Sequence, residues 1–149
     1  MRSACDSVYI KQSKQESTMR FLIVEDDFTS RKFMQTILSP YGDCDIAVNG
    51  KEALAAFEAS LSGEKYDLIC LDIMMPEMDG QEALRRMRDI ERSKGIRSTD
   101  EVKVVMITAL DDPKNVVEAY YKGGATSYVP KPVDRQLFIQ LLKNLGVIA

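Results

Sequence analysis

The chain alternates between short apolar runs and stretches with helical spacing, and this alternation restricts the possible fold more than any other feature. The apolar runs are RFLIV (20–24), CDIAV (44–48), DLICL (67–71), VKVVMIT (102–108) and TSYV (126–129). Each run precedes a segment in which apolar residues recur every three or four positions, as they do along one face of a helix. Five such units in succession predict a doubly wound α/β fold with a five-stranded parallel sheet and five helices.

Five groups of apolar residues define the expected helices. They are Phe33, Met34, Ile37 and Leu38; Ala53, Leu54, Phe57 and Leu61; Ala83, Leu84, Met87 and Ile90; Val116, Val117 and Tyr120; and Leu137, Phe138, Leu141, Leu142 and Leu145. The runs at 20–24, 67–71 and 102–108 do not alternate cleanly, which is typical of strands covered on both faces. The polar stretch 91–101 is expected to form a surface loop.

Length and composition restrict the number of domains and the kinds of partner. A chain of 149 residues suits one domain, which we expect at 19–149 after a weakly ordered extension at 1–18. That extension lacks the apolar core of a signal peptide, and Met19 is a candidate natural start. The net charge of −3 disfavours nucleic acid, and no apolar run approaches the length of a membrane span. The sequence therefore predicts a cytoplasmic protein with neither a nucleic-acid nor a membrane partner.

The chain contains no histidine, and none of its three cysteines lies in a C-x-x-C pair. Zinc sites, haem ligation and histidine-based acid–base chemistry are disfavoured by this composition. Cys70 lies within an apolar run and is expected to be a small core residue.

Polar and charged residues stand at the ends of four predicted strands. They are Glu25, Asp26 and Asp27 after the first strand, Asp72 after the third, Thr108 at the end of the fourth and Lys131 after the fifth. Ligands of open α/β sheets bind beyond the carboxyl ends of the strands, where these residues would meet. Two carboxylates about 4 Å apart repel by about 4 kcal/mol at an effective dielectric constant of 20. Lys131 can offset part of this repulsion, and a hard cation such as Mg²⁺ can offset the rest.

Each of these residues has an ordinary structural explanation when it is considered alone. Asp27 by itself is best explained as a helix cap, Thr108 as a structural residue at a strand end, and Lys131-Pro132 as a turn. The joint arrangement of acidic, hydroxyl and ammonium groups at four strand ends is what indicates a site.

The segments FLIVEDD, DLICLDIMMPEMDG, VVMITAL and SYVPKP make residues 20 to 146 resemble the receiver domains of bacterial two-component response regulators. The resemblance implies a flavodoxin-like parallel sheet in strand order 2-1-3-4-5 with five helices. It also implies a signalling phosphoacceptor, which promotes only its own phosphotransfer and dephosphorylation and is not otherwise an enzyme.

The resemblance implies that Asp72 accepts a phosphoryl group from a phosphohistidine. The donor would be a sensor histidine kinase or a histidine phosphotransfer protein. Glu25, Asp26 and Asp72, with the backbone carbonyl of Met74, would hold Mg²⁺, and Mn²⁺ is a possible substitute. Phosphoryl transfer depends mainly on positioning and charge neutralisation, which suits this set of groups.

The resemblance also implies a switch. Thr108 would turn toward the phosphoryl oxygens, Lys131 would pair with them through a loop with a cis bond to Pro132, and Tyr128 would move between outward and inward positions. The signal would leave through the face formed by the fourth helix, fifth strand and fifth helix, toward an unknown protein partner. The protein would be a monomer or a phosphorylation-dependent dimer.

Two pairs of residues are expected to affect the lifetime of the phosphoryl group and the surface near the switch. Met74 and Leu110 stand two residues beyond Asp72 and Thr108, and their apolar side chains predict slower self-dephosphorylation than polar ones would give. Tyr120 is expected to pack in the core, and an exposed Tyr121 could belong to a partner surface.

Three alternatives to a single-domain switch are considered. The chain could be a receiver excised from a longer regulator or hybrid kinase, although its terminal GVIA does not look like a cut linker. A Mg²⁺-dependent aspartyl phosphohydrolase would carry D-x-D-x-[TV] after the first strand, where this chain has EDDFT. A flavodoxin-like mononucleotide binder would need a Ser/Thr/Gly-rich loop there, and EDDFTS is acidic.

Overall fold

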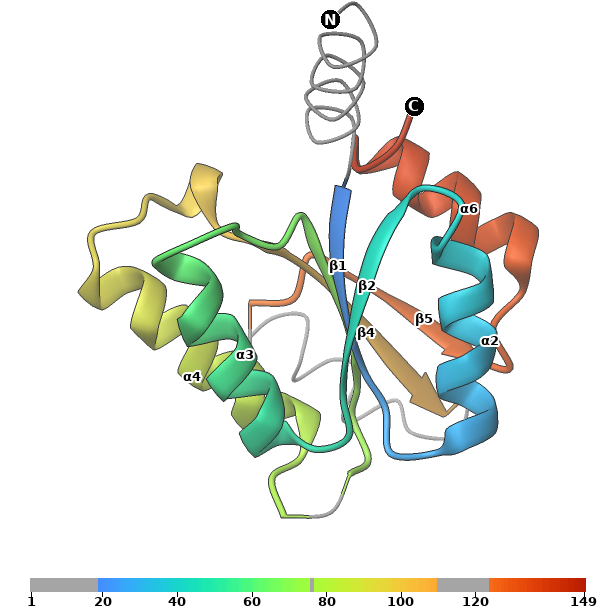
Figure 1. Cartoon of the computed structure of the whole chain (residues 1–149), viewed down its shortest axis with the longest axis horizontal. Helices are drawn as coiled ribbons and strands as arrows, with labels where there is room; N and C mark the ends of the chain where they lie inside the picture. The colour runs from blue at the N-terminus through green and yellow to red at the C-terminus, as the bar shows by residue number, and fades with distance from the viewer. Residues whose placement is uncertain (1–18, 76, 110–123) are drawn as a thin grey trace, which may run out of the picture.

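A computed structural model describes residues 19–75, 77–109 and 124–149, in which five parallel strands form one sheet (Figure 1). The strands are β1 (Met19–Val24), β2 (Gly42–Ala47), β3 (Leu68–Asp72), β4 (Lys103–Ala109) and β5 (Ser127–Lys131). Their order is β2-β1-β3-β4-β5, and every pair of neighbours is parallel. The doubly wound sheet and its strand order are therefore confirmed.

Helices cover both faces of the sheet. Figure 1 shows α2 (Phe28–Leu38) and α6 (Arg135–Asn144) on one face, with α3 (Gly50–Leu61) and α4 (Gly80–Ser93) on the other. A short 3₁₀ helix, η1, spans Ser98–Asp100. Within the described segments no helix is long and apolar enough to cross a lipid bilayer. The expectations for 1–18, Pro76, Leu110, the helix around 116–120 and Tyr121 lie outside the described residues.

The central strand β3 explains why its sequence is almost wholly apolar. All five of its residues are buried, because β3 lies between β1 and β4 and both of its faces are covered. Ile69 and Leu71 pack into the core beneath α3 and α4, while Leu68 and Cys70 pack into the core beneath α2 and α6. The same buried strand carries Asp72 as its last residue, at its carboxyl end.

Each described α-helix begins with a short polar side chain that accepts a hydrogen bond from a backbone amide of the first turn. These caps are Asp27, Asn49, Asp79 and Asp134. Asn49 accepts from the amide of Glu52 at 2.9 Å, and the carboxylate of Glu52 accepts from the amide of Val48 at 3.0 Å. This reciprocal pattern satisfies the amide of Glu52 in the first turn and the amide of Val48 just before the cap. The assignment of Asp27 as a helix cap is confirmed.

Most element boundaries lie within one residue of the sequence predictions, and three differ by two residues or more. Strand β2 begins at Gly42 rather than residue 44, and β5 continues to Lys131 rather than ending at 129. The stretch 91–101 is not entirely a surface loop, because α4 continues to Ser93 and Glu91 is buried within it. Polar composition suggested a loop there because the sequence does not show that Glu91 has a buried partner.

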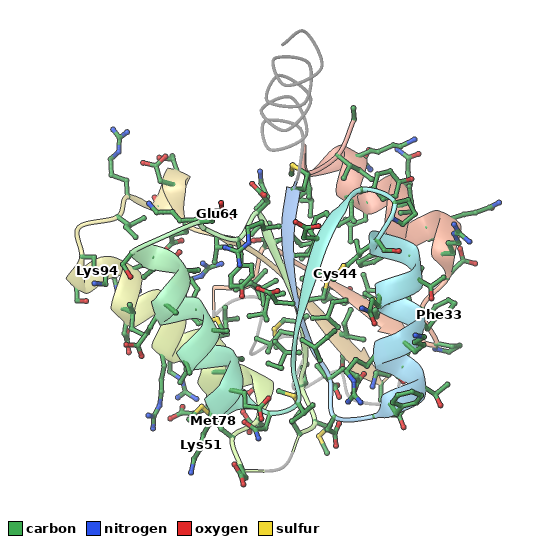
Figure 2. The ribbon with its side chains drawn as sticks, in the orientation of Figure 1. Phe33, Cys44, Lys51, Glu64, Met78 and Lys94 are labelled. Atoms are coloured by element: carbon green, nitrogen blue, oxygen red, sulfur yellow. The ribbon has the colours of Figure 1, made fainter. Side chains whose placement is uncertain are left out.

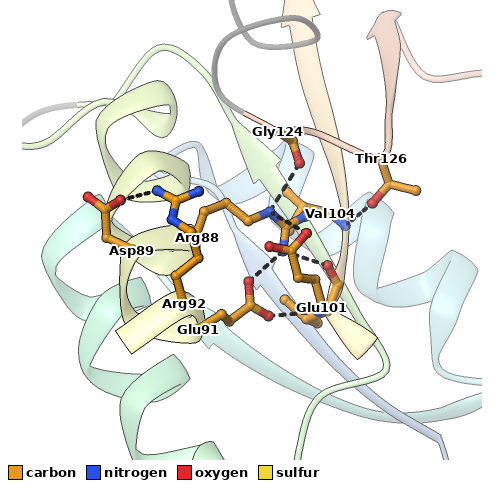
Figure 3. Close-up of polar contacts among 9 residues, drawn as sticks. Arg88, Asp89, Glu91, Arg92, Glu101, Val104, Gly124 and Thr126 are labelled. Atoms are coloured by element: carbon orange, nitrogen blue, oxygen red, sulfur yellow. Dashed lines mark hydrogen bonds and ion pairs between the residues drawn. The ribbon is translucent and has the colours of Figure 1, made fainter. Parts of the chain in front are cut away.

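That partner is Arg88, and Figure 3 shows the buried network that the two residues form. Nη1 of Arg88 lies 2.8 Å from Oε1 of Glu91, and both side chains are almost fully buried. Arg88 also donates to the backbone carbonyls of Val102 at 2.9 Å and Gly124 at 3.0 Å, while Glu91 accepts from the amide of Val102 at 2.8 Å. The network therefore ties α4 to the beginning of β4 and to the segment that leads into β5.

Two residues assigned to the apolar helical pattern lie on the surface. Phe33 is 43% exposed and Leu137 is 72% exposed. Figure 2 shows Phe33 on the side of α2 that faces away from the sheet. Helical spacing predicts an apolar stripe, but it does not reveal how wide a stripe the sheet covers. Met34, Ile37 and Leu38 form the buried part of that stripe on α2.

Candidate functional site

The candidate site forms at the carboxyl ends of β1, β3, β4 and β5. Glu25 follows β1 directly and donates its backbone amide to the carbonyl of Ala47 at 3.0 Å, which fixes the start of the loop. Asp72 is the last residue of β3, and the register places it beside Ile107 of β4. Thr108 is buried one position further along, and Lys131 ends β5 opposite Ala109. Parallel pairing therefore delivers residues from distant parts of the sequence to one edge, as predicted.

Lys131 lies between two buried carboxylates. Its Nζ is 3.0 Å from Oε1 of Glu25 and 3.4 Å from Oδ2 of Asp72. The Lys131 side chain is 33% exposed, whereas both carboxylates are buried. The bond from Lys131 to Pro132 is cis, as the family resemblance implied.

The pKa values of two groups reflect this proximity. Burial raises the pKa of Glu25, contact with the Asp72 carboxyl raises it further, and Lys131 only partly opposes the increase. Partial burial alone would lower the pKa of Lys131. Its hydrogen bond to Glu25 and the charge of Asp72 outweigh that effect, so the pKa of Lys131 lies above its ordinary value. One ammonium group therefore does not fully compensate the negative charge that gathers here.

The acidic residues fit a divalent cation. One carboxylate oxygen each from Glu25, Asp26 and Asp72 lies within 4.8 Å of the other two. Asp26 is exposed while the other two are buried, so the cluster opens toward solvent on one side. Oxygen ligands with open positions for water are what Mg²⁺ prefers. The three side chains predicted as metal ligands are thus brought together.

The backbone after Asp72 is held close to its carboxylate. The amide of Met74 donates to Oδ1 of Asp72 at 3.3 Å, and the amide of Gly80 donates to the carbonyl of Ile73 at 2.9 Å. A side chain at Gly80 would collide with the backbone carbonyl of Asp72. The pair Asp79-Gly80 therefore both begins α4 and makes a close contact with the end of β3.

Arg31 contributes to the site and was not predicted from the sequence. Its Nη1 donates to the backbone carbonyl of Glu25 at 3.2 Å and lies 3.4 Å from that of Asp26. Arg31 follows the cap Asp27 by four residues, so the first turn of α2 places it over the loop. The sequence signal that could have identified Arg31 is its position one helical turn after the acidic residues 25–27. This signal is weak, because many exposed arginines occupy such positions without a role.

Thr108 and Tyr128 occupy the positions expected for a switch pair, but their movement stays a prediction. The hydroxyl of Thr108 lies 3.3 Å from the carbonyl of Ala109, to which it donates. Tyr128 is in the middle of β5 beside Met106, and its side chain is 45% exposed. This orientation corresponds to the outward position named for the aromatic switch residue.

An apolar groove lies beside the acidic cluster and was also not predicted. Its volume is about 540 Å³, and its lining includes Phe33, Met34, Pro132 and Val133 together with Glu25 and Lys131. Phe28, at the start of α2, is exposed and stacks against the guanidinium of Arg31 at 5.4 Å. An exposed apolar surface next to charged groups is typical of a protein-binding site.

The fold and the site define a class of α/β signalling proteins that accept a phosphoryl group at the carboxyl edge of the sheet. Residues 21–143 match the family model described as the response regulator receiver domain. The chain belongs to this family, and it is a receiver domain of two-component systems. Members of the family are signalling phosphoacceptors that generally bind Mg²⁺ through acidic residues.

Similar proteins and structures agree with this assignment. The chain is 31% identical over 142 residues to the chemotaxis protein CheY of Treponema pallidum, which covers 94% of this chain and 91% of that protein. It resembles the receiver domain of Ssk1 in a co-crystal with the histidine phosphotransfer protein Ypd1 from Saccharomyces cerevisiae. That match has a TM-score of 0.77 and 26% identity, and it covers 87% of this chain and 90% of the other.

Other relatives are much longer than this chain. It is 31% identical over 127 residues to hybrid signal transduction histidine kinase I of Dictyostelium discoideum, which covers 84% of this chain but 7% of that protein. It spans 54% of the probable transcriptional regulator ycf29 of Porphyra purpurea. Receiver domains of this kind therefore occur within several protein architectures.

Proposed function

We propose that Asp72 accepts a phosphoryl group from a phosphohistidine and that its charge state controls a protein–protein contact. The observation that carries this proposal is the placement of Asp72 between Lys131, at 3.4 Å, and the acidic residues Glu25 and Asp26. Asp72 is the acidic residue that ends the central strand, so it is rigidly held and reached from the open side of the site. Rigid placement of the nucleophile is what phosphoryl transfer requires.

In the proposed reaction a carboxylate oxygen of Asp72 attacks the phosphorus of the donor. The phosphorus–nitrogen bond breaks, an oxygen–phosphorus bond forms, and the released imidazole nitrogen takes up a proton. Glu25, Asp26 and Asp72, with the backbone carbonyl of Met74, would hold Mg²⁺, which supplies positive charge to the phosphoryl oxygens. Lys131 is already within reach of both Glu25 and Asp72, so it can transfer its contact to the new phosphoryl group.

The output of the reaction follows from the added charge. An acyl phosphate carries about −1.5 to −2 charges and strong acceptor oxygens, to which the Thr108 hydroxyl and the Lys131 ammonium can donate. Thr108 would give up its present contact with the carbonyl of Ala109 to do so. The space that it leaves would favour an inward position of Tyr128, and the surface around β5 would change.

The apolar groove supports a protein donor. Phe33, Pro132 and Val133 line it, and Glu25 and Lys131 connect it to the acceptor site. A partner that docks here would bring a phosphohistidine near Asp72. The similar Ssk1 receiver was crystallised with a histidine phosphotransfer protein, which is the class of donor that we propose. The cytoplasmic location and the oligomeric states expected from the sequence stay predictions.

A small-molecule donor tests the proposal without a partner. The protein is incubated with phosphoramidate and Mg²⁺, and its intact mass is compared with that of Asp72→Asn and of Asp67→Asn, a control for an exposed aspartate before β3. We expect one phosphoryl group on wild type and on Asp67→Asn, and none on Asp72→Asn. Equal labelling of Asp72→Asn would exclude Asp72 as acceptor. Many turnovers of a phosphate ester would instead favour the hydrolase alternative.

A further inference from the structure

We propose that Met74 is a site of sulfoxidation by peroxides and that its oxidation shortens the lifetime of the acyl phosphate on Asp72. The inference rests on the proposed function, because it concerns the stability of the phosphoryl group that Asp72 would carry. It means that the site would respond to oxidants as well as to phosphorylation.

The first support is the exposure of Met74 relative to the other methionines. Met74 is 65% exposed, more than any other methionine among residues 19–75, 77–109 and 124–149. Three other described methionines, Met34, Met87 and Met106, are 4% exposed or less. The remaining ones in these ranges, Met19, Met75 and Met78, are partly buried and pack against one of the two cores. Among the methionines that the structure describes, peroxide therefore reaches Met74 most readily.

The second support is the position of Met74 at the acceptor carboxylate. Its backbone amide donates to Oδ1 of Asp72 at 3.3 Å, so the backbone of Met74 lies within hydrogen-bond distance of the carboxylate that would carry the phosphoryl group. The neighbouring methionines of the same loop differ in this respect. Met78 packs against Gly50 at the start of α3, on the core side of the loop.

The two thiols that the structure describes, those of Cys44 and Cys70, do not compete strongly for the oxidant. Burial and the nearby carboxylates of Asp43 and Asp45 raise the pKa of Cys44 to about 11, and full burial raises the pKa of Cys70 further. The thiolate is the form of cysteine that reacts, so both residues stay mostly unreactive at neutral pH. A thioether has no proton to lose, and its reaction with peroxide does not depend on such a pKa.

The chemical step is an oxygen transfer. The sulfur of Met74 attacks one oxygen of hydrogen peroxide and the oxygen–oxygen bond breaks. The proton on the oxygen now bound to sulfur passes to the departing hydroxide, which leaves as water. The sulfur is oxidised by two electrons and the peroxide is reduced by two electrons. The flexible apolar side chain becomes a polar sulfoxide.

The sulfoxide changes how water meets the acyl phosphate. A thioether is a weak hydrogen-bond acceptor, so Met74 does not hold a water molecule beside the phosphoryl group. A sulfoxide oxygen is a strong acceptor and can orient such a water for attack on phosphorus. One added hydrogen bond in the transition state corresponds to an increase in hydrolysis rate of about two- to tenfold.

The test compares wild type with Met74→Leu, which cannot be oxidised at this position, and Met78→Leu, which keeps Met74. Each protein is treated with dilute hydrogen peroxide, the oxidised residues are identified by peptide mass spectrometry, and Asp72 is then phosphorylated with phosphoramidate. The decay of the phosphorylated species is followed by intact mass. A Met74→Gln variant, whose amide oxygen imitates the sulfoxide, is measured without peroxide.

We expect Met74 to oxidise first and the acyl phosphate to decay about two- to tenfold faster in oxidised wild type and oxidised Met78→Leu. Met74→Leu should be unaffected by peroxide, and Met74→Gln should decay faster without it. Oxidation of another methionine before Met74, or equal decay before and after oxidation of Met74, would overturn the inference alone. Absence of any phosphoryl group on the untreated protein would overturn the proposed function and this inference with it.

Discussion

The ammonium group of Lys131 lies 3.0 Å from the carboxylate of Glu25. This ion pair connects the loop that follows β1 to the end of β5. Because Glu25 is buried beside Asp72, its charged form depends on the nearby cation. The same ammonium is 3.4 Å from Asp72. Lys131 therefore stabilises the site before any phosphoryl group arrives.

Replacement of Lys131 by methionine should make stability strongly pH-dependent when Mg²⁺ is removed by a chelator. The pKa of Glu25 is higher in the folded protein than its ordinary value of 4.5, so the protonated carboxyl stabilises the folded state. This contribution to the free energy of unfolding is fully present below pH 4.5 and is lost as the pH rises through the pKa of the folded state. Loss of the cation raises that pKa further and enlarges the loss near neutral pH. Since the Lys131 side chain is 33% exposed, we expect a deficit of about 1–2 kcal/mol near neutral pH.

Urea unfolding of Lys131→Met and wild type, at pH 4.5 and near neutral pH, measures this difference. The deficit should shrink at the lower pH, and Lys131→Arg should restore most of the stability. An equal deficit at both pH values would show that the effect is loss of packing and not of charge.

Mg²⁺ should stabilise the folded protein, and Asp26 should be required for this effect. A ligand that binds only the folded state at ten times its dissociation constant adds about 1.4 kcal/mol to the free energy of unfolding. Asp26→Asn removes the negative charge of one expected metal ligand. Because Asp26 is exposed, the substitution should weaken Mg²⁺ binding without damaging the fold.

The neighbouring substitution Asp27→Asn is the matched control for Asp26→Asn, because asparagine also caps helices and Asp27 serves as the cap of α2. Thermal unfolding with and without Mg²⁺ should show the metal-dependent shift in wild type and Asp27→Asn only. A full shift in Asp26→Asn would remove Asp26 from the metal site.

Gly80→Ala should displace the backbone of Asp72 and so impair the proposed acceptor site. An added Cβ would collide with the backbone carbonyl of Asp72, where only backbone atoms are present to move. We expect a loss of about 1–3 kcal/mol in stability and slower phosphorylation of Asp72. Gly63→Ala is the control, since a Cβ there meets nothing closer than 3.9 Å. Unchanged phosphorylation and stability in Gly80→Ala would contradict the role assigned to this contact.

Arg88→Met should destabilise the fold by about 3–5 kcal/mol, because it leaves the buried carboxylate of Glu91 without its ion-pair partner. Arg92→Met, four residues further along α4, removes an exposed arginine that pairs with Asp89 and should cost less than about 1 kcal/mol. Chemical unfolding measures both changes. A double variant, Arg88→Met with Glu91→Leu, should recover part of the loss. A loss as small as that of Arg92→Met would show that the network of Figure 3 contributes little to stability.

Much of this fold could be predicted because the sequence patterns that indicate strands and helices are local and recur along the chain. The apolar runs predicted the sheet, and the rule that ligands meet at the carboxyl ends of parallel strands predicted that Glu25, Asp26, Asp72 and Lys131 would meet. Thr108 lies one position past the partner of Asp72 in β4, as that reasoning requires.

Other features depend on tertiary contacts that no local pattern reveals. The charged face of α4 gives no sign that Arg88 and Glu91 are buried, because the backbone groups that they bind, at Val102 and Gly124, lie in segments distant in sequence. Phe33 and Leu137 satisfy helical spacing but lie outside the stripe that the sheet covers. The apolar groove beside the site is the consequence, since Phe33 lines it instead of the core.

The most direct test of the central claim is to locate the phosphoryl group on the chain. Wild-type protein is phosphorylated with phosphoramidate and Mg²⁺ and treated with borohydride, which reduces an aspartyl phosphate to homoserine. Peptides are then sequenced by mass spectrometry. The account predicts homoserine at position 72 and no other modified aspartate. Homoserine at Asp26 or Asp27 with an unmodified Asp72 would contradict it.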